Sequence, residues 1–282
     1  MLLSQMDEEG SSITGAGGNR PEKIAAVQQP SLLLLFDQGN RPSRKDIVDS
    51  ISGSNRLFVS HDPYDAPPSG SHPLHRERGR EDHAWLELLC DGLTFDLLGL
   101  DGGPGLVLGE IAHSFGLSES LASGAIESVG LFPGPHLAEG ANSLPVVRTM
   151  AAIAMEFVER LPGCKAVLWS PARSAMSADF FRRAVGDWLA GGPFPALGLI
   201  GYQKGDRGNL ESEGLAFFSG YELSISHALA EDRIAATKLA VRAVNSLVGA
   251  LPPETDLPIE IDGRALMLRP DPARCLIFVE PA

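Results

Sequence analysis

Two β-hairpin signals constrain the fold of this chain more than any other feature of its sequence. Asp91-Gly92 and Asp262-Gly263 each stand between two runs in which apolar and polar residues alternate. An Asp-Gly pair readily adopts the positive φ angles of a two-residue turn, and the alternation buries one face of each strand. Because hairpins require antiparallel pairing, the sequence predicts an α+β fold, with an antiparallel β-sheet and helices packed on one face.

Helical periodicity and composition predict how the chain is divided. Apolar residues recur at helical spacing in 142–161, 177–190 and 227–249, and short apolar runs at 31–37 and 165–170 predict buried strands. The order of elements allows two related α+β halves, although no sequence repeat joins them.

We expect three parts along the 282 residues. Residues 1–30 are rich in Gly and Ser and lack periodicity, which predicts a disordered tail. Residues 31–125 form an N-terminal α+β half, interrupted at 61–83 by a His/Pro-rich stretch that predicts a mobile surface insertion. Residues 126–282 form a C-terminal α+β half.

The charge excludes some classes of partner. The formal net charge is −13, from 36 acidic and 23 basic residues. Such a chain repels phosphates, so we expect no nucleic-acid partner. An apolar window of about 18 residues is missing, so we expect no membrane partner. Three scattered cysteines form no disulfide framework and the first residues do not resemble a signal peptide, so we expect a cytoplasmic protein.

The search for catalytic motifs finds none of the common ones. The sequence contains no G-x-S-x-G elbow, Walker loop, H-E-x-x-H or C-x-x-C, and its glycine-rich stretches lack dinucleotide-binding spacing. His61, His72, His75 and His83 share the predicted insertion and could hold zinc or nickel, yet their spacing matches no known ligand pattern and a solvated loop explains them better. We therefore predict no catalytic residue, no cofactor and no metal site.

Four residues of the middle segments are candidates for contact with a ligand or partner. His136 precedes a predicted helix N-terminus, where free N–H groups favour anions, and Arg148 lies in that helix. Trp169 and Ser170 follow a buried strand, at a place where α/β units often hold ligand groups. Each has a structural alternative: His136 can bond to local backbone, and Trp169 can fill the core or anchor a partner.

The segment "NLESEGLAFFSGYELSI", 209–225, supplies the last two candidates, Phe218 and Glu222. Its glycines predict a bent or bulged strand in which Phe217 and Phe218 point to opposite faces. Glu222 could be a functional carboxylate, but the spacing identifies no partner for it.

Three segments, "GLAFFSGYELSI", "AVLWSPARSAMSADFFRRAV" and "FPALGLIGYQ", together resemble the bacterial domain-of-unknown-function family 4261 over about residues 125–280. Ser219 departs from the family, in which phenylalanine and glycine stand closer. The resemblance implies a shared fold and no activity, since the family's motifs are mostly structural. The matching positions are Gly214, Leu215, Phe218, Gly220, Glu222 and Leu223.

The sequence favours one function and leaves alternatives. The favoured hypothesis is a non-catalytic module that binds another protein, a basic one, as an accessory, adaptor or toxin-neutralising partner, because an acidic surface attracts basic proteins. The alternative is a small-ligand binder or enzyme with a pocket near His136, Arg148, Ser170 and Glu222. The oligomeric state stays open.

Overall fold

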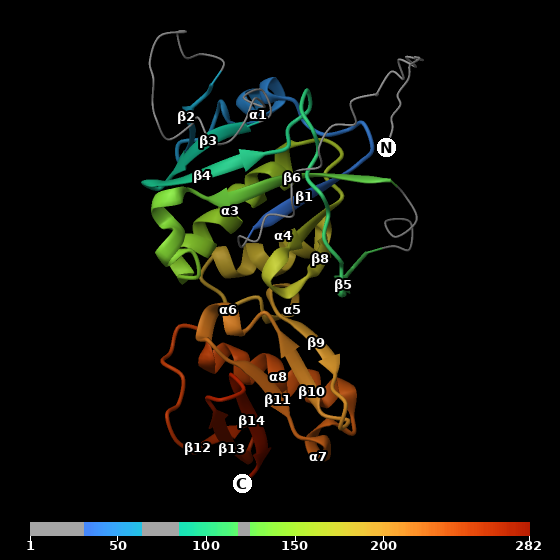
Figure 1. The fold of residues 1–282 in the computed structure, drawn as a ribbon, viewed down its shortest axis with the longest axis vertical. Coiled ribbons are helices and arrows are strands. Elements are labelled where there is room, and N and C mark those ends of the chain that lie inside the picture. The colour runs from blue at the N-terminus through green and yellow to red at the C-terminus, as the bar shows by residue number, and fades with distance from the viewer. Residues whose placement is uncertain (1–30, 64–84, 118–124) are drawn as a thin grey trace, which may run out of the picture.

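The computed structural model describes residues 31–63, 85–117 and 125–282, which form two halves stacked along the long axis of the molecule (Figure 1). Each half is built on one β-sheet with helices packed against it, so the predicted α+β class is confirmed. The predicted tail at 1–30 and residues 64–83 of the predicted insertion lie outside the described residues.

The upper half contains an eight-stranded sheet, the large sheet, in the order β2-β3-β4-β6-β1-β7-β8-β5. Neighbouring strands are antiparallel, except that β5 runs parallel to β8. The strands are β1 (Leu32–Asp37), β2 (Leu57–His61), β3 (Trp85–Cys90), β4 (Leu93–Leu98), β5 (His113–Phe115), β6 (Ile126–Pro133), β7 (Ala166–Trp169) and β8 (Ser174–Ser177).

Helices α1 (Arg44–Ile51), α3 (Leu144–Arg160) and α4 (Ala178–Leu189) pack against one face of the large sheet. The other face is partly covered by residues 99–112, whose Leu106 lies over Gly130. This contact closes a second, smaller apolar core, which contains Leu33, Leu35, Phe132, Ala166, Leu168 and Ala175.

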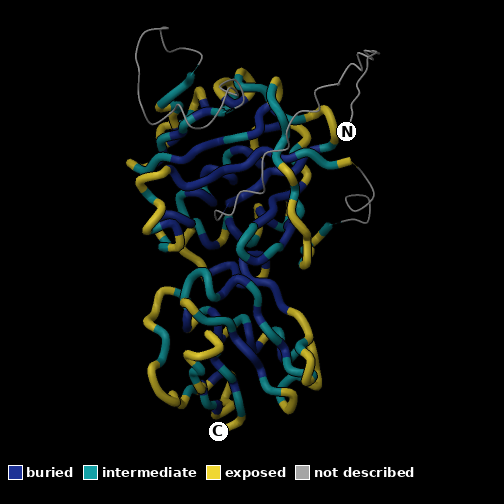
Figure 2. Tube along the Cα trace, in the orientation of Figure 1, coloured by how far each residue is buried: buried dark blue, intermediate teal, exposed yellow. Residues whose placement is uncertain are grey.

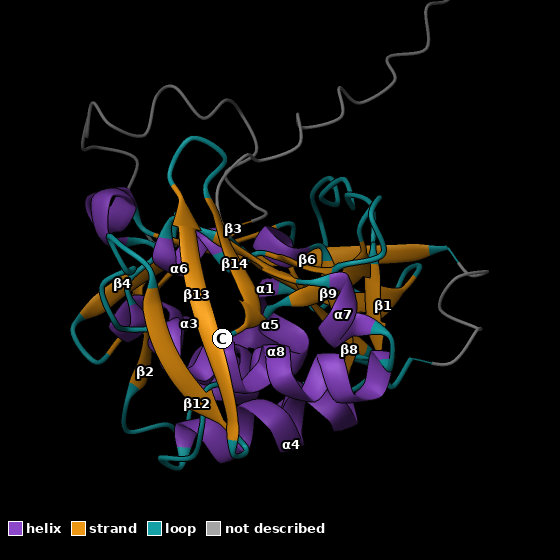
Figure 3. Cartoon of the chain, turned by 90° about the horizontal axis from the view of Figure 1, so that it is seen from below, coloured by secondary structure: helices purple, strands orange, loops and turns teal. Residues whose placement is uncertain are grey.

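The lower half contains a six-stranded sheet, the small sheet, in the order β12-β13-β14-β11-β10-β9. Helix α8 (Arg233–Leu247) packs along one face, and Figure 3 shows it on one side of β12, β13 and β14. The strands are β9 (Gly201–Lys204), β10 (Leu210–Glu213), β11 (Glu222–Ile225), β12 (Leu257–Ile261), β13 (Arg264–Asp271) and β14 (Leu276–Pro281).

The local signals of the sequence match these elements closely. Asp91 and Asp262 have positive φ angles of 50° and 55°, as the two hairpin turns require. Helix α4 begins where predicted, because Ser177 Oγ accepts a hydrogen bond from Phe180 N at 3.1 Å. Helix α3 follows Ser143 and has a proline in its first turn.

The boundary predicted at residue 126 does not coincide with the boundary between the sheets. Strand β1 lies in the middle of the large sheet, between β6 and β7, so the chain from 126 to 177 belongs to the upper half. The change of sheet falls in residues 190–200, between α4 and β9. A central strand needs partners on both sides, and here both come from later chain: Leu32 pairs with Leu131 of β6 and with Trp169 of β7.

Three segments adopt conformations that differ from the prediction. Residues 214–225, predicted as one bent strand, form helix α6 (Ala216–Ser219) and then β11. The predicted strand over "PALGLIGYQ" begins with α5 (Ala196–Leu199) before β9. The predicted helix 227–249 is split into α7 (His227–Ala230) and α8, because the Asp232 carboxylate accepts the first free N–H groups of α8.

We expect Asp232→Ala to lower the free energy of unfolding by about 1 kcal/mol, since it removes the N-cap of the helix that supports the small sheet. Urea unfolding of the full chain measures this loss. Glu231→Ala is the matched control, because this neighbouring carboxylate accepts no backbone hydrogen bond in the described structure. Equal losses in both variants would contradict the capping role.

Candidate functional site

The segments that the sequence singled out meet where the two halves join. Residues 169–174, from the upper half, lie against residues 213–222 of the lower half, and we call this region the junction. Figure 2 shows that buried chain continues through the narrow waist between the halves. A Cβ atom built on Gly214 would lie 2.7 Å from Ala172 Cβ, which shows how closely the two backbones approach.

A single carboxylate organises the lower side of the junction. Glu222 accepts hydrogen bonds from Gly214 N at 2.7 Å, Leu215 N at 3.1 Å and Ala216 N at 3.0 Å. A fourth comes from Ser212 Oγ at 2.5 Å. These amides lie at the start of α6 and have no partner within that helix. The carboxylate therefore caps a helical turn that precedes it in sequence, which explains why the predicted bent strand does not form.

An aromatic cluster fills the junction. Trp169 is fully buried, and its ring centroid lies 5.3 Å from that of Phe217 and 6.1 Å from that of Phe218. Phe194 lies edge-on to Phe218 at 5.1 Å and to Trp188 at 5.6 Å. Phe217 and Phe218 therefore do not point to opposite faces, as predicted for a strand, because the helical turn places both rings against Trp169.

Arg148 joins the edge of this aromatic cluster. Its guanidinium carbon lies 5.6 Å from the centre of the Trp188 ring, and its Nη2 donates to Leu189 O at 2.8 Å.

Two polar groups, Trp169 Nε1 and the Tyr202 hydroxyl, are buried without a hydrogen-bond partner in the described structure. Burial raises the pKa of Tyr202, and the negative charge of Glu222 raises it further.

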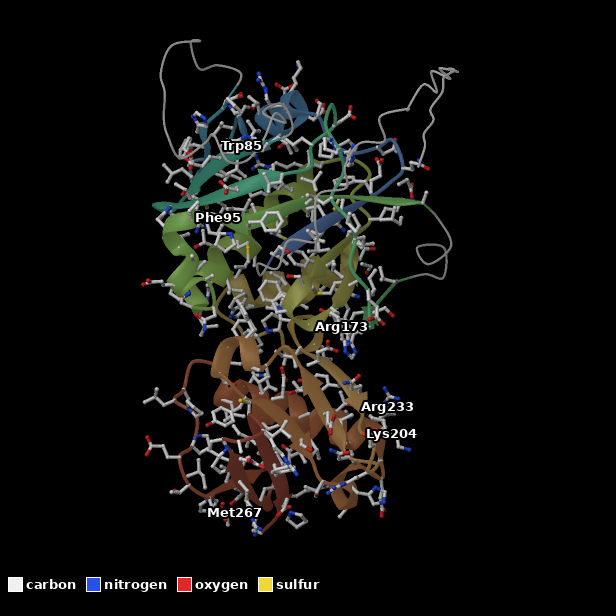
Figure 4. All side chains as sticks on the ribbon, viewed as in Figure 1. Trp85, Phe95, Arg173, Lys204, Arg233 and Met267 are labelled. Atoms are coloured by element: carbon white, nitrogen blue, oxygen red, sulfur yellow. The ribbon has the colours of Figure 1, made fainter. Side chains whose placement is uncertain are left out.

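A cluster of ionisable groups that no sequence motif indicates lies beside the aromatic rings. Arg173 has a left-handed φ angle of 46°, pairs with both carboxylate oxygens of Glu213, and reaches Glu110 at 2.6 Å. His113 Nε2 lies 2.8 Å from Glu213 Oε2. Figure 4 shows Arg173 at the waist between the halves. We call Arg173, Glu213, His113 and Glu110 the ion cluster.

The pKa of Glu213 depends on two opposing effects in the ion cluster. Partial burial raises the pKa of this carboxyl, but the hydrogen bonds and the charge interactions with Arg173 and His113 together lower it by more. The net pKa lies below the ordinary value of 4.5. No residue spacing in the sequence predicts this cluster, because its members come from different elements that only the tertiary fold brings together.

The remaining candidates have separate partners. Ser170 Oγ accepts from Ser31 N at 2.9 Å and lies 3.1 Å from Ser31 Oγ, which ties the start of β1 to the end of β7. His136 is exposed, and its ring nitrogens lie 3.4 Å from Thr94 Oγ1 on β4.

The pocket predicted near His136, Arg148, Ser170 and Glu222 finds no support in these contacts. In the described residues, no hydrogen bond or ion pair joins any two of the four. The shared pocket stays a prediction.

Metal and thiol chemistry find little support in the described ranges. Within 31–63, 85–117 and 125–282, no three His, Cys, Asp or Glu side chains gather as metal ligands would.

A small cavity of about 20 Å³ lies beside Cys90 and Glu156, large enough for one water molecule. Burial raises the pKa of the Cys90 thiol to about 11, so this thiol is a poor nucleophile. His72, His75 and His83 lie outside the described residues.

Comparisons of the chain with models of protein families, with curated proteins and with solved structures found no match. The resemblance to the domain-of-unknown-function family 4261 therefore stays a prediction. Its motif positions nevertheless share a structural role here, since Gly214, Phe218 and Glu222 all build the junction. No helix in the described parts of the chain combines the length and apolar composition needed to cross a membrane.

We expect Gly214→Ala to destabilise the protein by about 2–5 kcal/mol, the sum of a left-handed φ of 96° and the contact with Ala172. Gly220→Ala is the matched control. It has a similar φ of 80° but open space around it, so it should lose only about 1–2 kcal/mol. Denaturant midpoints measure both. A similar loss in the two variants would show that the close approach to Ala172 adds nothing.

We expect Glu213→Gln to change how stability depends on pH. Because the pKa of Glu213 is lowered by folding, its contribution is complete above 4.5 and is lost as pH falls through the folded value. The variant should be less stable than the wild type near pH 7, and the difference should shrink as the pH falls below 4.5. Thermal melts across this range measure it. Glu110→Gln, at a carboxylate whose side chain is 75% exposed, should change little. A constant difference at all pH values would contradict the role of the ionised Glu213.

Proposed function

We propose that this protein is a non-catalytic, cytoplasmic accessory module that binds another protein, and that the partner is basic. The main observation is that the polar candidates are engaged in holding the structure together. The Glu222 carboxylate accepts four hydrogen bonds that shape one segment, Ser170 is paired with Ser31, and Arg148 bonds to the end of α4. A catalytic group must instead be available to a substrate.

The net charge of −13 supports a basic partner. Opposite charges accelerate encounter and suppress association with like-charged proteins. Neutralisation of a basic toxin is one role that such a module could serve.

The state of the cysteines supports the proposed compartment. All three are free, and burial raises the pKa of Cys90 and Cys164 to about 11 and about 12. Free thiols fit a reducing environment, and the raised pKa values make Cys90 and Cys164 poor nucleophiles.

The test is affinity purification of the tagged full-length chain from its native cells at about 0.1 M and about 1 M salt, where the Debye length falls from about 10 Å to about 3 Å. We expect one basic protein to co-purify in stoichiometric amounts at low salt and to be lost at high salt. An unrelated protein of similar acidity with the same tag is the control for non-specific attraction. Recovery of the chain alone at low salt would contradict the proposal.

A further inference from the structure

The face of the small sheet opposite α8 carries apolar side chains where a solvated face usually carries polar ones. Cross-strand partners share a face of a sheet. The pairs Leu268–Val279 and Pro270–Ile277 therefore define the α8 face of β13 and β14, where Leu268, Ile277 and Val279 are buried. The intervening pairs lie on the opposite face, which we call the open face; they are Met267–Glu280, Arg269–Phe278 and Asp271–Leu276.

Three apolar residues form the centre of the open face. Met267, Leu276 and Phe278 are each partly exposed, and none belongs to either hydrophobic core of the protein. Phe278 pairs with Arg269 on one side and with Ser224 on the other, so it lies in the interior of the sheet. Apolar groups that gather outside the core are typical of interaction surfaces.

Carboxylates surround this apolar centre. By register, the strand positions of the open face include a single basic residue, Arg269, which lies 3.3 Å from Glu280 and 3.5 Å from Asp256. The acidic residues at these positions outside the junction are Glu211, Glu260, Asp271 and Glu280, whereas Glu213 and Glu222 are engaged in the junction. The open face is therefore complementary to a surface that is basic and has an apolar centre of its own.

The edge of the small sheet formed by β12 is a less suitable contact. Because a two-residue turn joins β12 to β13, Ile261 and Arg264 form a hydrogen-bonded pair. Backbone groups of successive residues alternate in direction, so those of Pro258 and Glu260 point away from β13. Pro258 has no N–H, which leaves Glu260 as the only outward donor of β12. A proline at this position protects an edge against added strands.

Building on the proposed function, we infer that the open face is the docking surface for a basic protein segment. Its Lys or Arg side chains meet the carboxylates, and an apolar side chain covers Met267, Leu276 and Phe278. Figure 4 shows Met267 at the end of the lower half remote from the junction, so docking leaves the junction undisturbed.

The test compares full-length Phe278→Ser with Phe58→Ser, a control at a phenylalanine that is 50% exposed on β2 of the other half. Far-UV circular dichroism and thermal melting establish that both variants fold. The probes are labelled peptides of alternating Lys and Leu, of Lys and Ser, and of Glu and Leu, measured by fluorescence anisotropy. We expect the Lys–Leu peptide to bind most tightly, and Phe278→Ser alone to weaken it by about tenfold or more.

Three results would overturn the inference. Equal binding of the Lys–Leu and Lys–Ser peptides would show attraction by charge alone. Equal binding of the Lys–Leu peptide to both variants would place the contact elsewhere. Self-association of the wild type, abolished by Phe278→Ser, would identify a second copy as the occupant.

Co-purification with the same variants separates this inference from the proposed function. A partner that is retained by Phe58→Ser and lost by Phe278→Ser supports both. A partner retained by both variants overturns the docking surface alone. A wild-type chain that purifies without a partner overturns the proposed function.

Discussion

The junction of the two halves depends on one carboxylate, that of Glu222. By accepting hydrogen bonds from three backbone amides and a hydroxyl, it caps the helical turn α6 (Ala216–Ser219) where an extended strand was predicted. Hydrogen bonds to a charged acceptor contribute about 1.5–3 kcal/mol each, more than neutral ones. That turn brings Gly214 against Ala172 and places Phe217 and Phe218 against Trp169. Glu222, which the sequence suggested as a functional carboxylate, therefore has a structural role in the other contacts of the junction.

Two kinds of interaction then join the halves, and they respond to different conditions. The aromatic rings around Trp169 carry no net charge, so salt does not screen their contacts. The ion cluster around Glu213 is partly exposed and depends on the charge of its carboxylate. Buried groups without partners, such as the Tyr202 hydroxyl, oppose folding by about 1–3 kcal/mol each, which the surrounding packing must outweigh.

The two faces of the small sheet divide stability from interaction. The face under α8 is buried and closes the lower core, whereas the open face combines partly exposed apolar residues with carboxylates. A face built only for solubility would not need Phe278 or Met267, and a face built only for stability would be covered. This combination is the basis on which we propose a binding function for the open face.

Local chemistry determined much of this protein from the sequence alone. Asp91-Gly92 and Asp262-Gly263 specify their turns, and Ser177 begins α4, because turn angles and helix caps depend on neighbouring residues.

Only the tertiary structure decided that β1 lies between β6 and β7, and that His113, Arg173 and Glu213 meet. It also placed Trp169 and Phe218 together, although each was singled out separately, and made residues 216–219 helical through a carboxylate that follows them. These outcomes depend on contacts between residues that are distant in sequence or lie on different elements. A periodic pattern predicts which residues are buried, but it does not predict which residues they pack against.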